Sequence, residues 1–167
     1  MTGFRSSHIS GRLSRLMMIT AAIAAAQPAA AADPVPPPPP AAARDKLGKA
    51  RDLVKAGDWP AAIQELKRVN DTRSADWHNL MGFSHRKLVT PDLAAAERHY
   101  DEALRIKPDH LGALEYTGEL HLMRGELPRA EARLATLAKA CPQGCEELED
   151  LKAAVAKFKA NGNRWQP

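Results

Sequence analysis

Three alanines recur at intervals of 34 residues along this chain: Ala62, Ala96 and Ala130. Each is followed four and seven residues later by a mostly apolar pair: Leu66 and Val69, Tyr100 and Ala103, Leu134 and Leu137. Side chains at i, i+4 and i+7 lie on one face of an α-helix. A 34-residue period is typical of helix-turn-helix arrays, in which each unit buries its apolar face against the next. The repeat therefore predicts an all-α fold.

Glycines and prolines divide the repeat region into helix pairs. The expected helices include residues 45–56, 59–69, 110–124, 127–140 and 146–159. Gly82 precedes Gly118 by 36 residues, so we expect two extra residues in the turn of the second pair, around residues 88–92. A turn accepts an insertion, whereas an insertion inside a helix would rotate its apolar face. The pattern predicts a right-handed solenoid of three helix-turn-helix pairs plus a C-terminal capping helix.

The N-terminal segment has the composition of a secretory signal peptide. Arg5, Arg12 and Arg15 precede a short apolar run, no acidic residue is present, and small residues lead up to Ala32. We expect cleavage near Ala32 and export to a bacterial periplasm. The alternative is a retained membrane anchor, although the apolar run is short for a bilayer span. No other stretch is apolar enough, so we expect no stable membrane span after the signal is removed.

The rest of the chain is expected to form three parts. These are a proline-rich linker at residues 33–43, a helical domain at residues 44–160 and a flexible tail at residues 161–167. The five prolines at positions 36–40 fix φ and donate no hydrogen bond, so the linker should be an extended, stiff spacer. A docking site for a polyproline-binding domain is the alternative.

The net charge argues against a nucleic-acid partner. The whole chain has 24 lysines and arginines against 20 acidic residues, a formal charge of +4. The signal segment contains three of the arginines and none of the acids, so its removal leaves 21 basic and 20 acidic residues. A nearly neutral chain lacks the basic surface on which nucleic-acid binding depends.

Small residues and prolines at fixed offsets resemble the tetratricopeptide repeat family. The positions that match are Gly118, Gly125, Ala130 and Pro142, then Gly82, Ala96, Tyr100, Ala103 and Pro108, then Gly57, Ala62 and Leu66. Ala50 replaces a usual glycine, and His85 and His121 replace a usual tyrosine. The resemblance covers about three repeats, the minimum for a stable stack.

The resemblance implies that the first helix of each pair lines a concave wall. The expected groove residues are Arg51, Lys55, Asn79, Phe83, Arg86, Lys87, Glu115, Glu119 and Met123, with Leu47, Val54 and Leu122 beside them. Leu80, Gly112 and Tyr116 stand where some repeat proteins hold a C-terminal carboxylate, so that clamp is not reproduced. We therefore expect the groove to bind an extended or helical peptide, and not a chain end.

The expected function is a periplasmic scaffold or adaptor that binds a protein or peptide partner. No nucleophile with its base, no paired catalytic carboxylates and no phosphate-binding glycine loop stand out, so we expect no enzymatic activity and no cofactor. One alternative is a structural spacer without a ligand.

The two cysteines, Cys141 and Cys145, flank a proline and a glycine that allow a sharp turn. In an oxidising compartment we expect a disulfide between them, and no metal site. The alternative is a thiol-redox or copper(I)-handling protein that uses both thiolates.

The histidines and tryptophans carry weaker expectations. His85 and His121 occupy equivalent positions in successive first helices, so they could approach each other; we expect both to be packed in place of tyrosine. Trp59 and Trp77 should pack near helix crossings, whereas Trp165 lies in the polar tail and is expected to fray.

Overall fold

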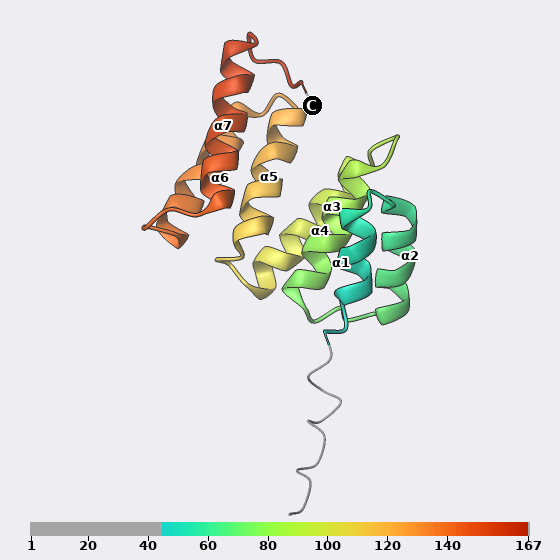
Figure 1. Ribbon diagram of the computed structural model, residues 1–167. Helices are drawn as coiled ribbons and strands as arrows, with labels where there is room; N and C mark the ends of the chain where they lie inside the picture. Colours follow the sequence, from blue (N-terminus) through green and yellow to red (C-terminus); the bar gives the residue numbers. More distant parts are fainter. Residues whose placement is uncertain (1–44, 167) are drawn as a thin grey trace, which may run out of the picture. The chain divides into compact units, whose positions relative to one another are not determined.

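The computed structural model describes residues 45–166, and within them the chain forms seven α-helices and no strand (Figure 1). The helices are α1 (Gly48–Lys55), α2 (Trp59–Val69), α3 (Ala75–Lys87), α4 (Leu93–Ile106), α5 (Leu111–Met123), α6 (Leu127–Ala140) and α7 (Glu146–Ala160). The all-α prediction is confirmed. The expected signal peptide at residues 1–32 and linker at residues 33–43 lie outside the described residues.

The second helix of each pair begins at an acidic residue, and these residues are 34 positions apart. Asp58 precedes α2 and Asp92 precedes α4, and each carboxylate accepts a hydrogen bond from the backbone N–H three residues later. Such a cap satisfies one of the unpaired N–H groups of the first helical turn. Glu126 precedes α6 but its side chain does not cap the helix; it pairs with His121 and Arg129 instead.

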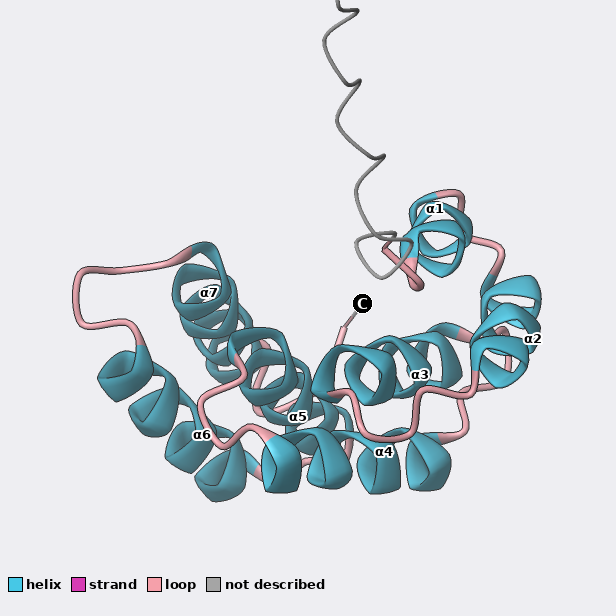
Figure 2. Cartoon of the chain, turned by 90° about the horizontal axis from the view of Figure 1, so that it is seen from below, coloured by secondary structure: helices cyan, strands magenta, loops and turns pink. Residues whose placement is uncertain are grey.

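The helices stack in two rows, as the solenoid prediction requires. Figure 2 shows α1, α3, α5 and α7 in one row and α2, α4 and α6 in the other. The pairs α1 with α2, α3 with α4 and α5 with α6 each pack together, and α3 and α5 link successive pairs. The first row lies on the inner side of the arc of described helices in Figure 2. Side chains on its free face form the wall on which a ligand would bind.

The recurring alanines occupy equivalent buried sites. Ala62, Ala96 and Ala130 are each 0% exposed. A methyl group at these positions lets neighbouring helices approach closely, because a longer side chain would hold them apart. The sequence prediction for the core of each repeat is confirmed.

The extra residues of the second repeat lie in its turn. Helix α3 ends at Lys87 and α4 begins at Leu93, and Val89 between them is fully exposed. The backbone N–H of Asp92 donates to the carbonyl of His85 across this turn, with an N to O distance of 3.1 Å. The insertion therefore leaves the helical faces in register.

Helix α7 closes the end of the stack against α5 and α6. Its apolar face is buried at four positions: Leu148, Leu151, Val155 and Phe158. These residues join Leu114, Leu122, Ala130 and Leu137 in one hydrophobic cluster. The predicted capping helix is confirmed.

His85 and His121 contact residues of their own helix pairs and not each other. The ring of His85 stacks on that of His99 in α4, with 5.8 Å between ring centroids. His121 Nδ1 lies 2.9 Å from the Glu126 carboxylate. Each histidine therefore packs within its own helix pair, and the two rings do not meet across the stack.

Gly82 supports the closest helix approach in the second pair. A β-carbon at this position would lie 2.6 Å from the ring of Tyr100, which is fully buried, and 3.1 Å from the carbonyl oxygen of Ala96. A rigid ring and a helix backbone leave no room for displacement. Gly82 is therefore required by the distance between α3 and α4, and not by its φ angle.

We predict that Gly82→Ala destabilises the protein by about 1–3 kcal/mol, because it overpacks this crossing. The measurement is the free energy of unfolding in urea, followed by helical circular dichroism. Gly48→Ala is the matched control: the nearest atom to its β-carbon, in Asp45, is 3.6 Å away. Alanine at position 48 should leave stability unchanged or raise it by up to about 1 kcal/mol. Equal stability of both variants would contradict the proposed close approach.

Candidate binding groove

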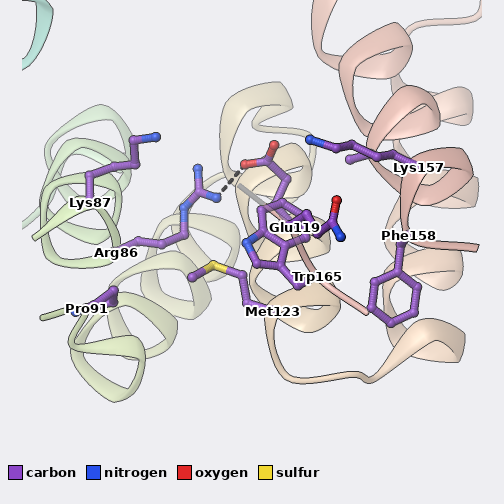
Figure 3. Close-up of a pocket in the computed structure, with 10 residues that line it drawn as sticks. Arg86, Lys87, Pro91, Glu119, Met123, Lys157, Phe158 and Trp165 are labelled. Atoms are coloured by element: carbon purple, nitrogen blue, oxygen red, sulfur yellow. Dashed lines mark ion pairs between the residues drawn. The ribbon is translucent and has the colours of Figure 1, made fainter. Parts of the chain in front are cut away.

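A pocket of about 560 Å³ opens on the inner row, at the C-terminal ends of α3, α5 and α7 (Figure 3). Its lining residues are Arg86, Lys87, Pro91, Glu119, Met123, Ala154, Lys157, Phe158, Trp165 and Gln166. A volume between about 300 and 1,000 Å³ is usual for a binding site. This pocket is the clearest candidate for ligand contact in the described part of the chain.

Arg86 lies at one side of the pocket and is only 6% exposed. Its guanidinium forms an ion pair with Glu119 at 2.5 Å, marked by the dashed line in Figure 3. The same group stacks on Phe83 and Tyr116, at 5.4 Å and 5.2 Å from the ring centroids. A buried charge is tolerated when an opposite charge and aromatic faces replace water around it. These contacts fix the guanidinium in one orientation.

The predicted groove residues separate into three groups. Arg86, Lys87, Glu119 and Met123 line the pocket. Phe83 and Asn79 lie on α3, nearer its N-terminus than Arg86, and the Phe83 ring lies under the Arg86 guanidinium. Arg51 and Lys55 lie on α1, where Arg51 bridges Asp45 and Asp76 and Lys55 is exposed. The structure brings the central residues together but leaves the α1 residues outside this pocket.

The expectation that Leu47 and Leu122 face a ligand is wrong. Leu122 is 0% exposed in the cluster that packs against α7, and Leu47 is 5% exposed beneath α2 and α3. Helix α5 is covered by α4, α6 and α7, so most of its surface is core. Leu122 therefore stabilises the stack, whereas its neighbour Met123 reaches the pocket.

Glu115 lies on the same wall as the pocket, one helical turn before Glu119, and is 6% exposed. Burial, together with the nearby carboxylates of Glu119 and Asp150, raises its pKa to about 8, and Arg86 opposes this shift. The carboxyl group is consequently neutral at pH 7. The wall therefore carries less negative charge than its sequence indicates.

The pocket residues that sequence reasoning missed all lie beyond the second repeat's first helix: Pro91, Ala154, Lys157, Phe158, Trp165 and Gln166. The sequence pattern predicts α7 as a capping helix and residues 161–167 as a frayed tail, so it assigns neither to a binding site. The run Asn161-Gly162-Asn163 is the signal that could have corrected this. Gly162 and Asn163 have φ of 68° and 59°, and the N–H of Asn163 donates to the carbonyl of Phe158. This helix-ending motif folds the chain back beside α7.

Cys141 and Cys145 lie between α6 and α7 with their sulfurs 2.22 Å apart, at bonding distance. Both are partly buried against the cluster that α7 completes. A bridge that closes so short a loop constrains the unfolded chain only slightly. It joins the last repeat to the beginning of the cap.

Within residues 45–166, no group of three or more His, Cys, Asp or Glu side chains is arranged to hold a metal ion. No helix in that range is long and apolar enough to cross a membrane.

We predict that Glu115→Gln increases stability at pH 8 but has little effect at pH 5. Between its ordinary pKa of 4.5 and the folded value of about 8, the folded state holds a proton that the unfolded chain releases, so stability falls as pH rises. Glutamine removes this dependence, and we expect a gain on the order of 2 kcal/mol at pH 8.

The measurement is urea unfolding of variant and wild type at both pH values, because other titrating groups cancel in the difference. Asp101→Asn, at an exposed site on α4, is the control and should show no such pH-dependent difference. A constant difference between Glu115→Gln and wild type would contradict the raised pKa.

Residues 92–155 match a family model described as tetratricopeptide repeat. The match begins at the N-cap of α4 and extends into α7, so it contains the α5–α6 hairpin and, of the helices that line the pocket, α5 and most of α7. No curated protein matches the chain. The 34-residue spacing, the buried small residues and the stacked hairpins agree with this match. Over residues 92–155 the chain is therefore similar to the tetratricopeptide repeat family.

Proposed function

We propose that the protein is a noncovalent scaffold that binds a segment of a protein partner on its inner row of helices. Tetratricopeptide repeats indicate a protein–protein interaction scaffold. The observation that carries the finer proposal is the pocket at the ends of α3, α5 and α7, beside an oriented Arg86. Such a pocket combines apolar surface with a few fixed polar groups, as binding sites do.

The spacer alternative would require that no ligand enters this pocket. A spacer needs stable helices but no oriented charge on its free face. Arg86 is held by Glu119 and two aromatic rings at a position where an apolar side chain would avoid the desolvation of a charge. The retained charge favours the binding scaffold over the spacer.

We propose further that the scaffold acts after export, in the periplasm. The support is the order of basic, apolar and small residues in positions 1–32 together with two cysteines whose sulfurs lie at bonding distance. A copper(I) site would instead need both sulfurs as free thiolates, and a thiol-redox function would need the pair to alternate between dithiol and disulfide. The place of the pair, where the last repeat meets the cap and packs against its hydrophobic cluster, supports a structural role.

We predict that the protein isolated from its native cell envelope begins at Asp33 and is two hydrogen atoms lighter than the reduced form. Intact-mass spectrometry before and after reduction measures both properties. A Cys141→Ser, Cys145→Ser double variant should still bind the partner. A full-length mass, or free thiols in the native protein, would contradict export or the bridge respectively.

We predict that Lys87→Ala with Met123→Ala weakens partner binding by at least about tenfold, because both side chains line the pocket. The partner is first trapped in the native envelope by a photo-crosslinking amino acid at position 87, and affinity is then measured with the purified pair. Asp101→Ala with Lys139→Ala, at exposed sites of the other row, is the matched control and should bind normally.

Thermal unfolding by circular dichroism shows whether each pair of substitutions leaves the fold intact. A pocket variant that is folded and retains full affinity would favour the spacer or a partner surface elsewhere. Crosslinking from position 101 but not from position 87 would lead to the same conclusion.

A further inference from the structure

The pocket has apolar walls with a separate polar rim. Met123, Phe158 and Trp165 supply a thioether and two aromatic rings, and Ala154 and Pro91 complete the apolar lining. Figure 3 shows Met123 and Trp165 between the Arg86 side and the Phe158 side of the pocket. Space of about 560 Å³ accommodates one large apolar side chain with part of the backbone that carries it. The walls therefore select an apolar anchor residue.

The rim carries an excess of positive charge. Among the described lining residues, the positively charged side chains are Arg86, Lys87 and Lys157, and the negatively charged one is the carboxylate of Glu119. That carboxylate already lies against the Arg86 guanidinium. Lys87 is exposed, with its ammonium 5.9 Å from the centre of the Phe83 ring. An incoming negative charge thus meets more attraction than repulsion at this rim.

The negative ends of the helix dipoles do not reverse this balance. The partial charge at a helix C-terminus is only about half an elementary charge. The last carbonyls of α5 and α7 also accept backbone hydrogen bonds from residues that follow each helix. At the end of α5 the N–H groups of Arg124 and Gly125 donate to the carbonyls of Leu120 and Leu122. At the end of α7 the N–H groups of Asn161 and Asn163 donate to the carbonyls of Lys157 and Phe158. Full side-chain charges on the rim therefore dominate the field that a ligand experiences.

The acidic residues of the same wall lie away from the pocket. Glu115 precedes Glu119 by one turn and is neutral at pH 7 because burial raises its pKa to about 8. Glu147 and Asp150 lie in the first turns of α7, two turns or more before Lys157. A basic segment would find the ionised carboxylates of α7 about two turns or more away from Lys157 and the apolar anchor site.

We propose that this pocket binds an acidic segment of a protein partner, with one large apolar side chain inserted between Met123, Phe158 and Trp165. The inference rests on the proposed scaffold function and specifies its partner chemistry. Carboxylates on either side of the anchor lie against the Arg86, Lys87 and Lys157 rim. Trp165 forms the wall that sequence reasoning assigned to a frayed tail.

Trp165 contributes a wall because the chain turns back after α7. Gly162 and Asn163 adopt left-handed φ, and the Asn161 side chain donates to the side-chain oxygen of Gln166 at 3.2 Å. The half-buried Trp165 ring packs on the α7 cluster while one side remains open to the pocket. A ligand in the pocket consequently changes the surroundings of this indole directly.

The test is an NMR titration of the indole N–H signals with blocked pentapeptides at up to about 2 mM, a range that detects millimolar affinity. The acidic probe has phenylalanine between two pairs of glutamates. A basic probe replaces the glutamates with lysines, and a polar probe replaces the phenylalanine with serine. The Trp165 signal is identified by its loss in Trp165→Phe.

We expect the acidic probe to shift the Trp165 signal and to bind at least about fivefold more tightly than the basic and polar probes. Lys87→Glu should weaken the acidic probe by about five- to tenfold at low salt. Lys139→Glu, at an exposed site of α6, makes the same charge change away from the pocket and should have a much smaller effect.

Equal or tighter binding of the basic probe would overturn the acidic-segment inference. Equal binding of the serine probe would overturn the anchor site, and an unmoved Trp165 signal would overturn its role as a wall. The absence of any shift with the acidic probe would also reject the inference. Crosslinking from position 87 tests the scaffold function independently, so the two proposals fail separately.

Discussion

Contact between helices at small residues is the constraint on which the rest of the structure depends. Gly82 lies against the ring of Tyr100, and Ala96 is buried on the helix opposite. A close-packed interior has few voids and transmits a helix displacement to its neighbours, so this spacing sets where the other side chains of α3 lie. Arg86 lies one turn further along the same helix. The core glycine and the charged pocket residue are therefore parts of one rigid arrangement.

Two buried ionisable groups of the inner row, Arg86 and Glu115, have opposite outcomes. Arg86 keeps its charge, since Glu119 and the rings of Phe83 and Tyr116 surround it. Glu115 has carboxylates among its neighbours and takes up a proton instead, with a pKa of about 8. The charged Arg86 and the protonated Glu115 both make the net charge of this wall less negative. Net formal charge alone would not show this, because the sequence gives similar numbers of acids and bases.

Periodicity predicts the repeats well because burial repeats with them. Ala62, Ala96 and Ala130 lie at equivalent sites, and the extra residues of the second repeat lie in its turn. Prediction fails where a helix has more than one buried face. Leu122 was placed on the ligand wall, but α7 covers that side of α5; Trp165 was placed in a frayed tail, but the chain reverses at Gly162. These errors share a cause: contacts made by the cap follow no repeat.

The cap consequently contributes to the pocket as well as to stability. Phe158 is 2% exposed in the cluster that joins α7 to α5 and α6, and the same side chain lines the pocket. A change that loosens α7 would move this wall together with Trp165, whose position follows from the end of α7. The disulfide pair of Cys141 and Cys145 lies at the N-terminal end of α7. Helix α7 is therefore bounded by the cysteine pair at one end and by the reversing turn at the other, and it supplies both the core contacts of the cap and one wall of the pocket.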